Sequence, residues 1–364
     1  MAPAYDYVVA GGSFAGLVLA THLRGRVALI EKGEVGEGQT SACATTLDVV
    51  RKLGLEDAIE EVHEEGVVHT RGAVHRFPLP YPFCSFDYRR FCRLLAERID
   101  GDVVRAAAVG VAGDVVLTDS GAGVSGGAVI DCTGWRAALA RGVDPSFPVT
   151  VRRTYGLEKP AIGFADRGLH FYFEPRVRGD GYGWAFPAGE RTRAGVLSYV
   201  AADGVRDSTE TFLAAENMHG GHYHGGWLTA GLRPPFAGDV FTLGDSAGHC
   251  LPLTGEGIRP AVFFAQHLAG LLNAERDGGQ GRDETRARYA ALHWSFARRY
   301  EWLRRAQRLL RGWPDPPLGW FFRAFRRQGR VYDSVSRRYW ELAAPILPAP
   351  QLYGVHAAGV EVPA

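Results

Sequence analysis

The chain has 364 residues, more than one hydrophobic core usually serves, so we expect a large mixed domain with a smaller one inserted into it. Its 41 basic and 40 acidic residues nearly cancel, to a net charge of +1, which excludes the strong positive field of a nucleic-acid-binding protein. The five scattered cysteines show no C-x-x-C spacing and the twelve histidines no ligand pattern, so neither a disulfide framework nor a metal site is expected.

The beginning of the chain has no signal-peptide pattern, and no apolar run reaches the length that spans a bilayer. Together with the reduced cysteines this predicts a cytoplasmic protein, either free or peripheral to a membrane. The sequence does not indicate an oligomeric state.

In chain order, residues 5–10 predict a strand, residues 14–23 a helix, and residues 26–30 a second strand that ends at Glu31. This is a βαβ unit, the start of a doubly wound α/β domain. Further helices are expected over 47–62, 87–99, 207–219 and 258–272, and from 284 onward. Strands are expected as a hairpin over 67–86, a meander over 102–125, buried strands at 128–131 and 240–243, and a long antiparallel set over 149–200.

Glycines lie between the first strand and its helix, where Gly11 to Gly16 read GGSFAG. A dinucleotide site needs glycine there for a tight turn, for close approach of the pyrophosphate and for helix packing, although Ser13 stands at the middle position. A carboxylate at the end of the second strand is suited to ribose hydroxyls. We therefore predict cofactor contacts from this site, with an ordinary structural turn as the alternative; its residues are Gly11, Gly12, Ser13, Phe14, Ala15, Gly16, Glu31 and Lys32.

A second glycine-rich segment, FTLGDSAGHCLPLTGEGIRPA, occupies residues 241–261. With GGSFAG before it and VIDCTGWRAALAR at 129–141, the chain resembles the flavoproteins that share the para-hydroxybenzoate hydroxylase fold. The resemblance implies non-covalently bound FAD, with Asp245 holding the ribityl chain. It also implies that Pro252, Gly255, Gly257 and Ile258 line the isoalloxazine ring, next to a helix N-terminus that favours a reduced anionic flavin. The loop that contains Ser41 is expected to approach the same ring.

A third segment, GYGWAFP at 181–187, narrows the resemblance. It is similar to the Y-x-W-x-F-P element of geranylgeranyl reductases, which saturate prenyl C=C bonds, and the PLTGEGI turn has the form typical of that group. The chain departs from the pattern at Ser13, at Tyr88 where an arginine is common, and at Gly195 where a glycine pair is common. The predicted substrate-binding residues are Tyr172, Tyr182, Trp184, Phe186 and Pro187; plain core packing is the alternative for the aromatic ones.

The resemblance implies hydride transfer from flavin N5 to a C=C bond of an isoprenoid-like or polyene substrate. The electron donor would be NAD(P)H, ferredoxin or another reductase. Two alternatives stay open: an FAD-dependent monooxygenase of an aromatic or polyketide-like metabolite, and a redox-neutral flavoprotein of the lycopene-cyclase type. Halogenation ranks lower, because it needs a lysine in the pocket and neither Lys32 nor Lys52 lies in a matching context.

Four residues are candidates for catalytic contacts: Cys43, Tyr182, Trp184 and His249. Cys43 and His249 are possible proton donors beside the flavin, and ordinary buried packing is the alternative for each. The histidines of HGGHYHGG, residues 219–226, are expected to lie in a flexible loop.

The segment 298–340 interleaves arginine with tryptophan and phenylalanine, which suits either a helical cap or the surface of an anionic membrane. A hydrophobic small-molecule or lipid substrate is compatible with both. The predicted domains are an FAD-binding domain of 1–66, 87–148 and 236–280, an antiparallel-sheet substrate domain of 67–86 and 149–235, and a C-terminal helical segment of 281–364.

Overall fold

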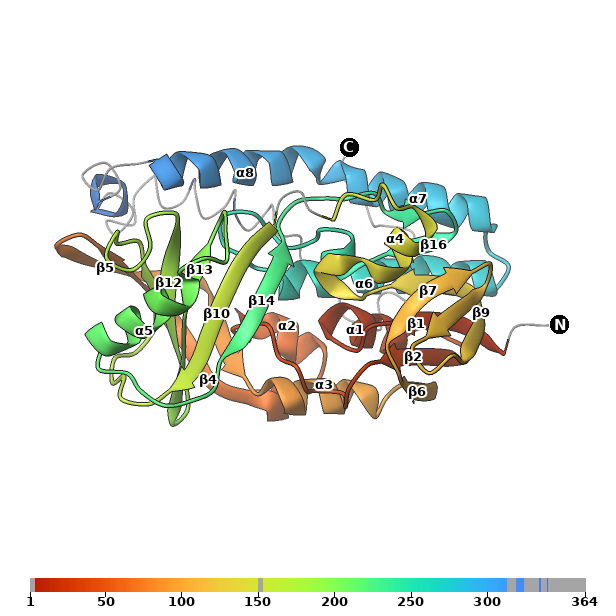
Figure 1. Cartoon of the computed structure of the whole chain (residues 1–364), viewed down its shortest axis with the longest axis horizontal. Coiled ribbons are helices and arrows are strands. Elements are labelled where there is room, and N and C mark those ends of the chain that lie inside the picture. Colours follow the sequence, from red (N-terminus) through yellow and green to blue (C-terminus); the bar gives the residue numbers. More distant parts are fainter. Residues whose placement is uncertain (1–3, 150–152, 313–318, 324–333, 335–338, 340–364) are drawn as a thin grey trace.

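The computed structural model describes residues 4–149, 153–312, 319–323, 334 and 339. Two eight-stranded sheets occupy opposite ends of the long axis of the molecule, with helices between and above them (Figure 1). This arrangement confirms the predicted fold class, a doubly wound α/β domain joined to an antiparallel sheet and followed by helices.

The first sheet is centred on β1 (Tyr5–Ala10) and follows the order β15-β16-β9-β1-β2-β6. β1 pairs in parallel with β2 and β9, so its carboxyl end meets theirs at one edge of the sheet, where ligands bind in such folds. The other strands are β2 (Val27–Glu31), β6 (Gly101–Arg105), β7 (Ala108–Ala112), β8 (Val115–Thr118), β9 (Gly123–Asp131), β15 (Phe236–Ala237) and β16 (Val240–Thr242).

Alternate residues of these strands enter two different cores. Tyr7 and Val9 pack with the helices α1 (Phe14–His22), α3 (Tyr88–Ala96) and α6 (Ile258–Arg276). Val8 and Ala10 face the opposite way, toward the β7–β8 meander and α4 (Ala138–Val143). The first sheet is therefore buried on both faces, which explains its nearly continuous apolar strands.

The second sheet follows the order β14-β10-β13-β12-β11-β4-β5-β3 and is antiparallel except where β11 pairs with β4. One face packs on α5 (Val205–Ala215), and the other faces the first domain. Its strands are β3 (Ala44–Thr46), β4 (Ile59–Thr70), β5 (Ala73–Phe86), β10 (Arg153–Ala161), β11 (Leu169–Tyr172), β12 (Gly181–Ala188), β13 (Arg191–Ser198) and β14 (His224–Thr229).

Two predicted elements are wrong. The helix expected over 47–62 ends early, as α2 (Leu47–Lys52), and after a short 3-10 helix, η1 (Glu56–Ala58), the chain enters β4. The hairpin therefore begins at Ile59 rather than at residue 67, so the predicted domain boundary at 66/67 falls inside a strand of the second sheet. The glycine loop expected over 219–226 also gives way to a strand, β14, at His224. The domain division itself stays a prediction.

Helices α7 (Arg282–Ser295) and α8 (Ala297–Gly312) follow α6, and α8 runs along the top of the molecule toward the second sheet (Figure 1). Within the described ranges, no helix is both long and apolar enough to cross a membrane. The remaining 3-10 helices are η2 (Gly134–Arg136) and η3 (Gly244–Ser246).

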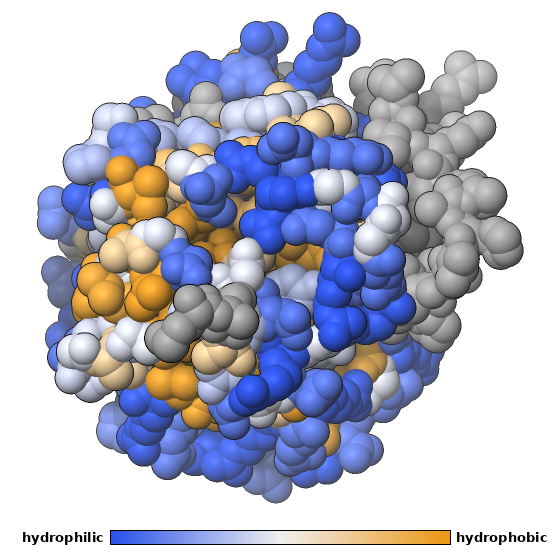
Figure 2. Space-filling view, turned by 90° about the vertical axis from the view of Figure 1, so that its right-hand side faces the viewer, coloured by the Kyte–Doolittle hydropathy of each residue, from blue (hydrophilic) through white to orange (hydrophobic). Residues whose placement is uncertain are grey.

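The end of the molecule formed by the first sheet is seen in Figure 2, where hydrophobic residues are scattered among hydrophilic ones. Val103, Val109 and Leu117 are exposed on β6, β7 and β8. Exposed aliphatic residues of this kind are common on protein surfaces and do not by themselves indicate a function.

Gly16 provides the first test, because a Cβ built there would lie 1.9 Å from the carbonyl oxygen of Gly11. We expect Gly16→Ala to lower the free energy of unfolding by several kcal/mol, of the order of ~3, whereas the same change at an ordinary helix glycine gains about 1 kcal/mol. Gly33→Ala is the control, since its Cβ would meet nothing nearer than 4.0 Å. Equal melting temperatures for the two variants would contradict the tight packing of α1 on the glycine turn.

Candidate functional site

The amino end of α1 lies at the carboxyl edge of the first sheet, behind the GGSFAG turn. Its N-cap, Ser13, makes no side-chain bond to the helix backbone, and no acidic residue occupies the first turn. The Ser13 hydroxyl oxygen instead accepts a hydrogen bond from the hydroxyl of Tyr88 at 3.1 Å. The first amides of α1 therefore lack a side-chain cap, which makes this helix end suitable for a phosphate group.

Glu31 ends β2 beside the same turn. The backbone N–H of Gly12 donates to one oxygen of its carboxylate at 2.6 Å, and a Cβ at Gly12 would lie 3.0 Å from the Glu31 side chain. The carboxylate is thus fixed next to the predicted phosphate site and stays partly exposed, as a ribose ligand must be. Lys32, by contrast, is exposed and has no described contact that directs it toward this site.

Asp245 lies on η3, just beyond the end of β16. Its neighbours Gly244 and Ser246 are buried, but Asp245 itself is partly exposed. Burial of the carboxyl raises its pKa to about 6, against the opposing effect of the Arg233 guanidinium. A carboxylate that is held in a poorly solvated place gains most from a hydrogen-bond donor supplied by a ligand.

The turn after η3 leads from Pro252 to the amino end of α6. Gly257 is the N-cap of α6, and no side chain caps this helix either. Gly255 has a φ of +67°, and Leu253 has a φ of +78°, which is unusual for a branched residue.

Glu256 holds the turn in place, because both its oxygens accept from Arg259, at 2.6 and 2.7 Å. Pro252 and Ile258 are buried at the two ends of this turn.

His249 is placed differently from the prediction, which made it a proton donor. Its Nδ1 accepts from the N–H of Gly244 at 3.2 Å, and its Nε2 lies 3.2 Å from Nδ1 of His293. His293 in turn donates to the carbonyl of Arg233 at 2.8 Å. Burial lowers the pKa of both rings, that of His293 to about 4. Both histidines are therefore neutral, and His249 supports the turn instead of reaching the pocket.

The inner face of the second sheet carries the aromatic residues of β12. Tyr182, Trp184 and Phe186 share this face with Leu169 and Leu197, and the loop residues Ala42 and Ala44 pack against them. Residues paired directly across strands share a face. The hydrogen bonds of Tyr182 and Tyr199 and the packing of Ala42 and Ala44 place the inner face beside the turn after η3 and beside residues 42–44. The region between these segments is the candidate pocket.

Trp184 belongs to a row of four residues across four strands that sequence analysis did not find. Trp184 pairs with Gly195, Gly195 with Glu158, and Glu158 with His224. A Cβ at Gly195 would lie 2.5 Å from the indole ring, so the glycine lets the ring cross β13. The indole N–H then donates to Glu158 at 2.8 Å, and the other carboxylate oxygen accepts from His224 at 2.7 Å. Trp184 is thus held in one orientation by a buried carboxylate.

Tyr182 is tied to the turn. Its hydroxyl donates to the carbonyl of Thr254 at 2.5 Å, and the hydroxyl of Tyr199 donates to the carbonyl of Leu253 at 2.6 Å. Burial raises the pKa of both phenols. Tyr182 thus links the second sheet to the turn, and the catalytic contact expected for it stays a prediction.

Cys43 has a left-handed backbone, with a φ of +50°, and is fully buried. Its thiol donates to the carbonyl of Ser41 at 3.4 Å, and its N–H donates to the Ser41 hydroxyl oxygen at 3.2 Å. Burial raises the pKa of the thiol well above its usual value, so Cys43 stays protonated at neutral pH. A proton-donating contact remains a prediction for this residue, and a cofactor contact remains one for Ser41.

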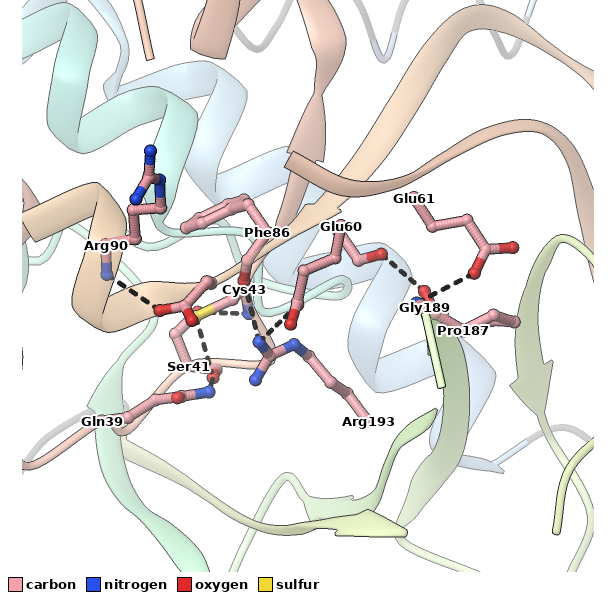
Figure 3. Close-up of polar contacts among 12 residues, drawn as sticks. Gln39, Ser41, Cys43, Glu60, Glu61, Phe86, Arg90, Pro187, Gly189 and Arg193 are labelled. Atoms are coloured by element: carbon pink, nitrogen blue, oxygen red, sulfur yellow. Dashed lines mark hydrogen bonds and ion pairs between the residues drawn. The ribbon is translucent and has the colours of Figure 1, made fainter. Parts of the chain in front are cut away.

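Arg193 lies beside Cys43 on the inner face, as Figure 3 shows. One terminal nitrogen donates to Glu60 and to the carbonyl of Phe86, both at 2.8 Å. Its buried Nε–H has no hydrogen-bond partner among the described residues. Sequence analysis missed Arg193, because it follows Arg191 and Thr192 at the beginning of β13, where a charged residue gives no signal.

Two predicted substrate-binding residues point away from the pocket. Tyr172 packs with Phe212 of α5, and its hydroxyl donates to Glu216 at 3.1 Å. Pro187 follows Phe186 on the strand and faces the opposite side. Consecutive residues of a strand point to opposite faces, so Pro187 cannot share the inner face with Phe186, and Tyr172 pairs with Gly183, next to Trp184, on the outer face.

The polar groups at this edge of the first sheet fit FAD. The structure offers two helix N-termini without side-chain caps, α1 and α6, for the pyrophosphate and for the electron-rich edge of the flavin ring. It also offers two partly exposed carboxylates, Glu31 and Asp245, for the ribose and ribityl hydroxyls. The Ser13 hydroxyl keeps its own hydrogen free to donate to a phosphate oxygen, because it accepts from Tyr88.

Comparison with known proteins agrees with this geometry. No family model matches the chain. It is 25% identical over 373 residues to digeranylgeranylglycerophospholipid reductase 2 of Methanothermobacter thermautotrophicus, which covers 92% of this chain and 94% of the relative. Its fold is similar to that of a geranylgeranyl bacteriochlorophyll reductase-like protein of Thermoplasma acidophilum, with a TM-score of 0.82 and 16% identity, covering 93% of this chain and 97% of that one.

It is also similar to p-nitrophenol 4-monooxygenase of Pseudomonas putida, with a TM-score of 0.73 and 16% identity over 95% of this chain and all of that one. The similarity to the curated relative and to these folds supports an FAD-dependent oxidoreductase. The fold is the one that the reductase-like protein and the monooxygenase share with this chain.

Asp245→Asn tests the ribityl contact. The raised pKa of Asp245 means that the cofactor-free protein gains stability from this carboxyl below pH 3.8 and loses it as the pH rises through about 6. Asn carries no charge, so we expect the melting temperature of the cofactor-free variant to rise relative to wild type between pH 4 and pH 7. The same variant should bind FAD about 10- to 100-fold more weakly, since a charge-assisted hydrogen bond of ~1.5–3 kcal/mol is lost.

Differential scanning fluorimetry across this pH range and flavin titration measure the two effects. Asp114→Asn, in the exposed turn between β7 and β8, is the control, and it should change neither quantity. Unchanged flavin affinity in Asp245→Asn would remove Asp245 from the cofactor site.

Proposed function

We propose that this chain is an FAD-dependent reductase that saturates a C=C bond of an isoprenoid-like or polyene substrate. The observation that carries the proposal is the apolar inner face of the second sheet, where Tyr182, Trp184 and Phe186 lie together against the turn after η3. An extended hydrocarbon offers no polar groups, so flat aromatic walls are the contacts that can hold it. The names of the curated relative and of the Thermoplasma structure support the same substrate class.

Bound FAD supplies the hydride, and it receives its electrons from NAD(P)H, ferredoxin or another reductase. The chain contributes the pocket. Trp184 forms a wall whose orientation Glu158 fixes, and the protonated thiol of Cys43 is the candidate for delivering a proton. The apolar cluster keeps water away from the reacting carbon atoms.

The second candidate, a monooxygenase, is favoured by the fold similarity to p-nitrophenol 4-monooxygenase. Halogenation receives no support from the lysines. Lys32 is exposed, Lys52 pairs with Asp48 at 2.7 Å on α2, and Lys159 pairs with Glu210 of α5 on the outer face of the second sheet.

An anaerobic experiment separates the candidates. The protein is reduced with dithionite without oxygen, and a prenyl substrate such as geranylgeranyl diphosphate is added. A reductase reoxidises its flavin under these conditions and yields a product heavier by two hydrogens per double bond. Flavin that stays reduced until oxygen enters, followed by a product that has gained an oxygen atom, would replace the reductase with the monooxygenase.

Trp184→Phe tests the pocket wall. The variant keeps an aromatic ring but leaves Glu158 without its indole donor, so we expect a stability loss of about 1–3 kcal/mol. We also expect at least a tenfold slower reoxidation per folded molecule, because a displacement of ~1 Å is enough for such a loss. Thermal denaturation and single-turnover reoxidation measure the two.

Phe212→Leu, on the outer face of the same sheet, is the matched control. It should lower the melting temperature while leaving reoxidation unchanged. If both variants behave alike, Trp184 is a packing residue only.

A further inference from the structure

We propose that the outward face of α8 docks this protein on the surface of an anionic lipid membrane. The inference goes beyond the reaction, since it concerns where the protein works, and it can be measured without turnover.

Helix α8 is attached to the body of the protein by one side. Tyr300 is 3% exposed and Leu303 is fully buried, and the hydroxyl of Tyr300 donates to the carbonyl of His249 at 2.5 Å. Phe296, just before the helix, is buried on the same side. This side of α8 therefore packs against the body of the protein. The opposite face needs no apolar residues for packing, so polar residues would be expected there.

The opposite face is not polar throughout. Arg298, Trp302, Arg305 and Leu309 follow the i, i+4, i+7, i+11 spacing of one helix stripe, and all four are exposed. Trp302 is 44% and Leu309 60% exposed, although the helix has no need of them for packing. Large apolar residues alternating with arginine on the solvent side are characteristic of helices that lie in a membrane interface.

The charge of α8 complements lipid phosphate. The helix has six arginines and one acidic residue, Glu301, which pairs with Arg304 and Arg305. The whole chain has a net charge of only +1, so this excess is local to the helix. Each basic residue near an anionic bilayer contributes about 1 kcal/mol, and arginine also binds phosphate through two N–H groups. The face thus combines apolar insertion with attraction to negatively charged lipid.

Residues 319–323 bring a further aromatic side chain to the inner face of the second sheet. Phe322 stacks on Phe173 with 6.0 Å between the ring centres, and Phe173 lies 5.4 Å from Tyr182 of the inner face. Trp320, two residues before Phe322, is 64% exposed. Phe173 and Phe322 thus extend the aromatic side chains of the inner face beyond Tyr182, toward the segment that contains the exposed Trp320.

The test is flotation of the FAD-loaded protein with phosphatidylcholine vesicles that contain either no anionic lipid or 30 mol% phosphatidylglycerol, at low and high salt. We expect binding to the anionic vesicles only, reduced at least tenfold by high salt. Arg298→Glu/Arg305→Glu and Trp302→Ser/Leu309→Ser should each reduce it at least tenfold, because one removes attraction and the other insertion. The flavin content of both double variants should match wild type, and both should remain folded at the assay temperature.

The matched control is Val109→Ser/Arg141→Glu, which makes the same types of change at exposed sites on the first domain, and it should bind like wild type. The proposal fails if the protein does not bind anionic vesicles, if it binds neutral ones equally, or if the α8 variants bind normally. It also fails if light scattering shows a lipid-free dimer that Trp302→Ser/Leu309→Ser dissociates, because the face would then be an interface between two copies. None of these outcomes depends on which reaction the flavin performs.

Discussion

Two tyrosine hydroxyls hold the candidate pocket together. Tyr182 on β12 and Tyr199, just after the end of β13, each donate to a carbonyl of the turn that follows η3. This turn leads directly to the amino end of α6, and its Leu253 has a backbone conformation that a branched residue adopts only when its surroundings enforce it. The bonds therefore fix the distance between the aromatic wall and the edge against which a flavin would lie. The candidate pocket therefore depends on the contact between the second sheet and the turn after η3.

Two residues near the predicted cofactor site differ from the pattern of the family that the chain resembles, and these two residues contact each other. Ser13 replaces a glycine in the first turn and Tyr88 replaces an arginine at the start of α3, and the two side chains form a hydrogen bond. A lone serine would crowd the phosphate approach, and a lone tyrosine would remove a positive charge. Together, they place the Ser13 hydroxyl at the predicted phosphate site, and the buried phenol of Tyr88 holds it in position. Gly195 has a comparable effect in the pocket, where its missing side chain makes room for the indole of Trp184.

The sequence was sufficient to predict those helices and strands whose local residue pattern matches the structure that they adopt in the folded protein. The strand, glycine turn and helix from Tyr5 to His22 follow from an apolar run, a GGSFAG turn and a helical period, and the structure has them in this order. The second sheet was harder, because residues 59–65 are rich in glutamate, and the propensity for helix is overridden by pairing with β5. Cross-strand register is absent from a sequence. The row of Trp184, Glu158 and His224 is therefore invisible before the strands are paired, and so was the opposite orientation of Tyr172.

The hydrogen-bonded histidines behind the turn make the protein sensitive to acid. Both rings must remain neutral, and an unfolded chain binds protons at these sites near pH 6.5, whereas folded His293 does so only near pH 4. The stabilisation they provide is complete above pH 6.5 and declines as the pH falls toward 4. Because His249 also bonds to Gly244 and Tyr300, the segment that carries Asp245 loosens together with the contact to α8. The two histidines therefore favour neutral over acidic pH, whereas the raised pKa of Asp245 on the same segment acts in the opposite direction.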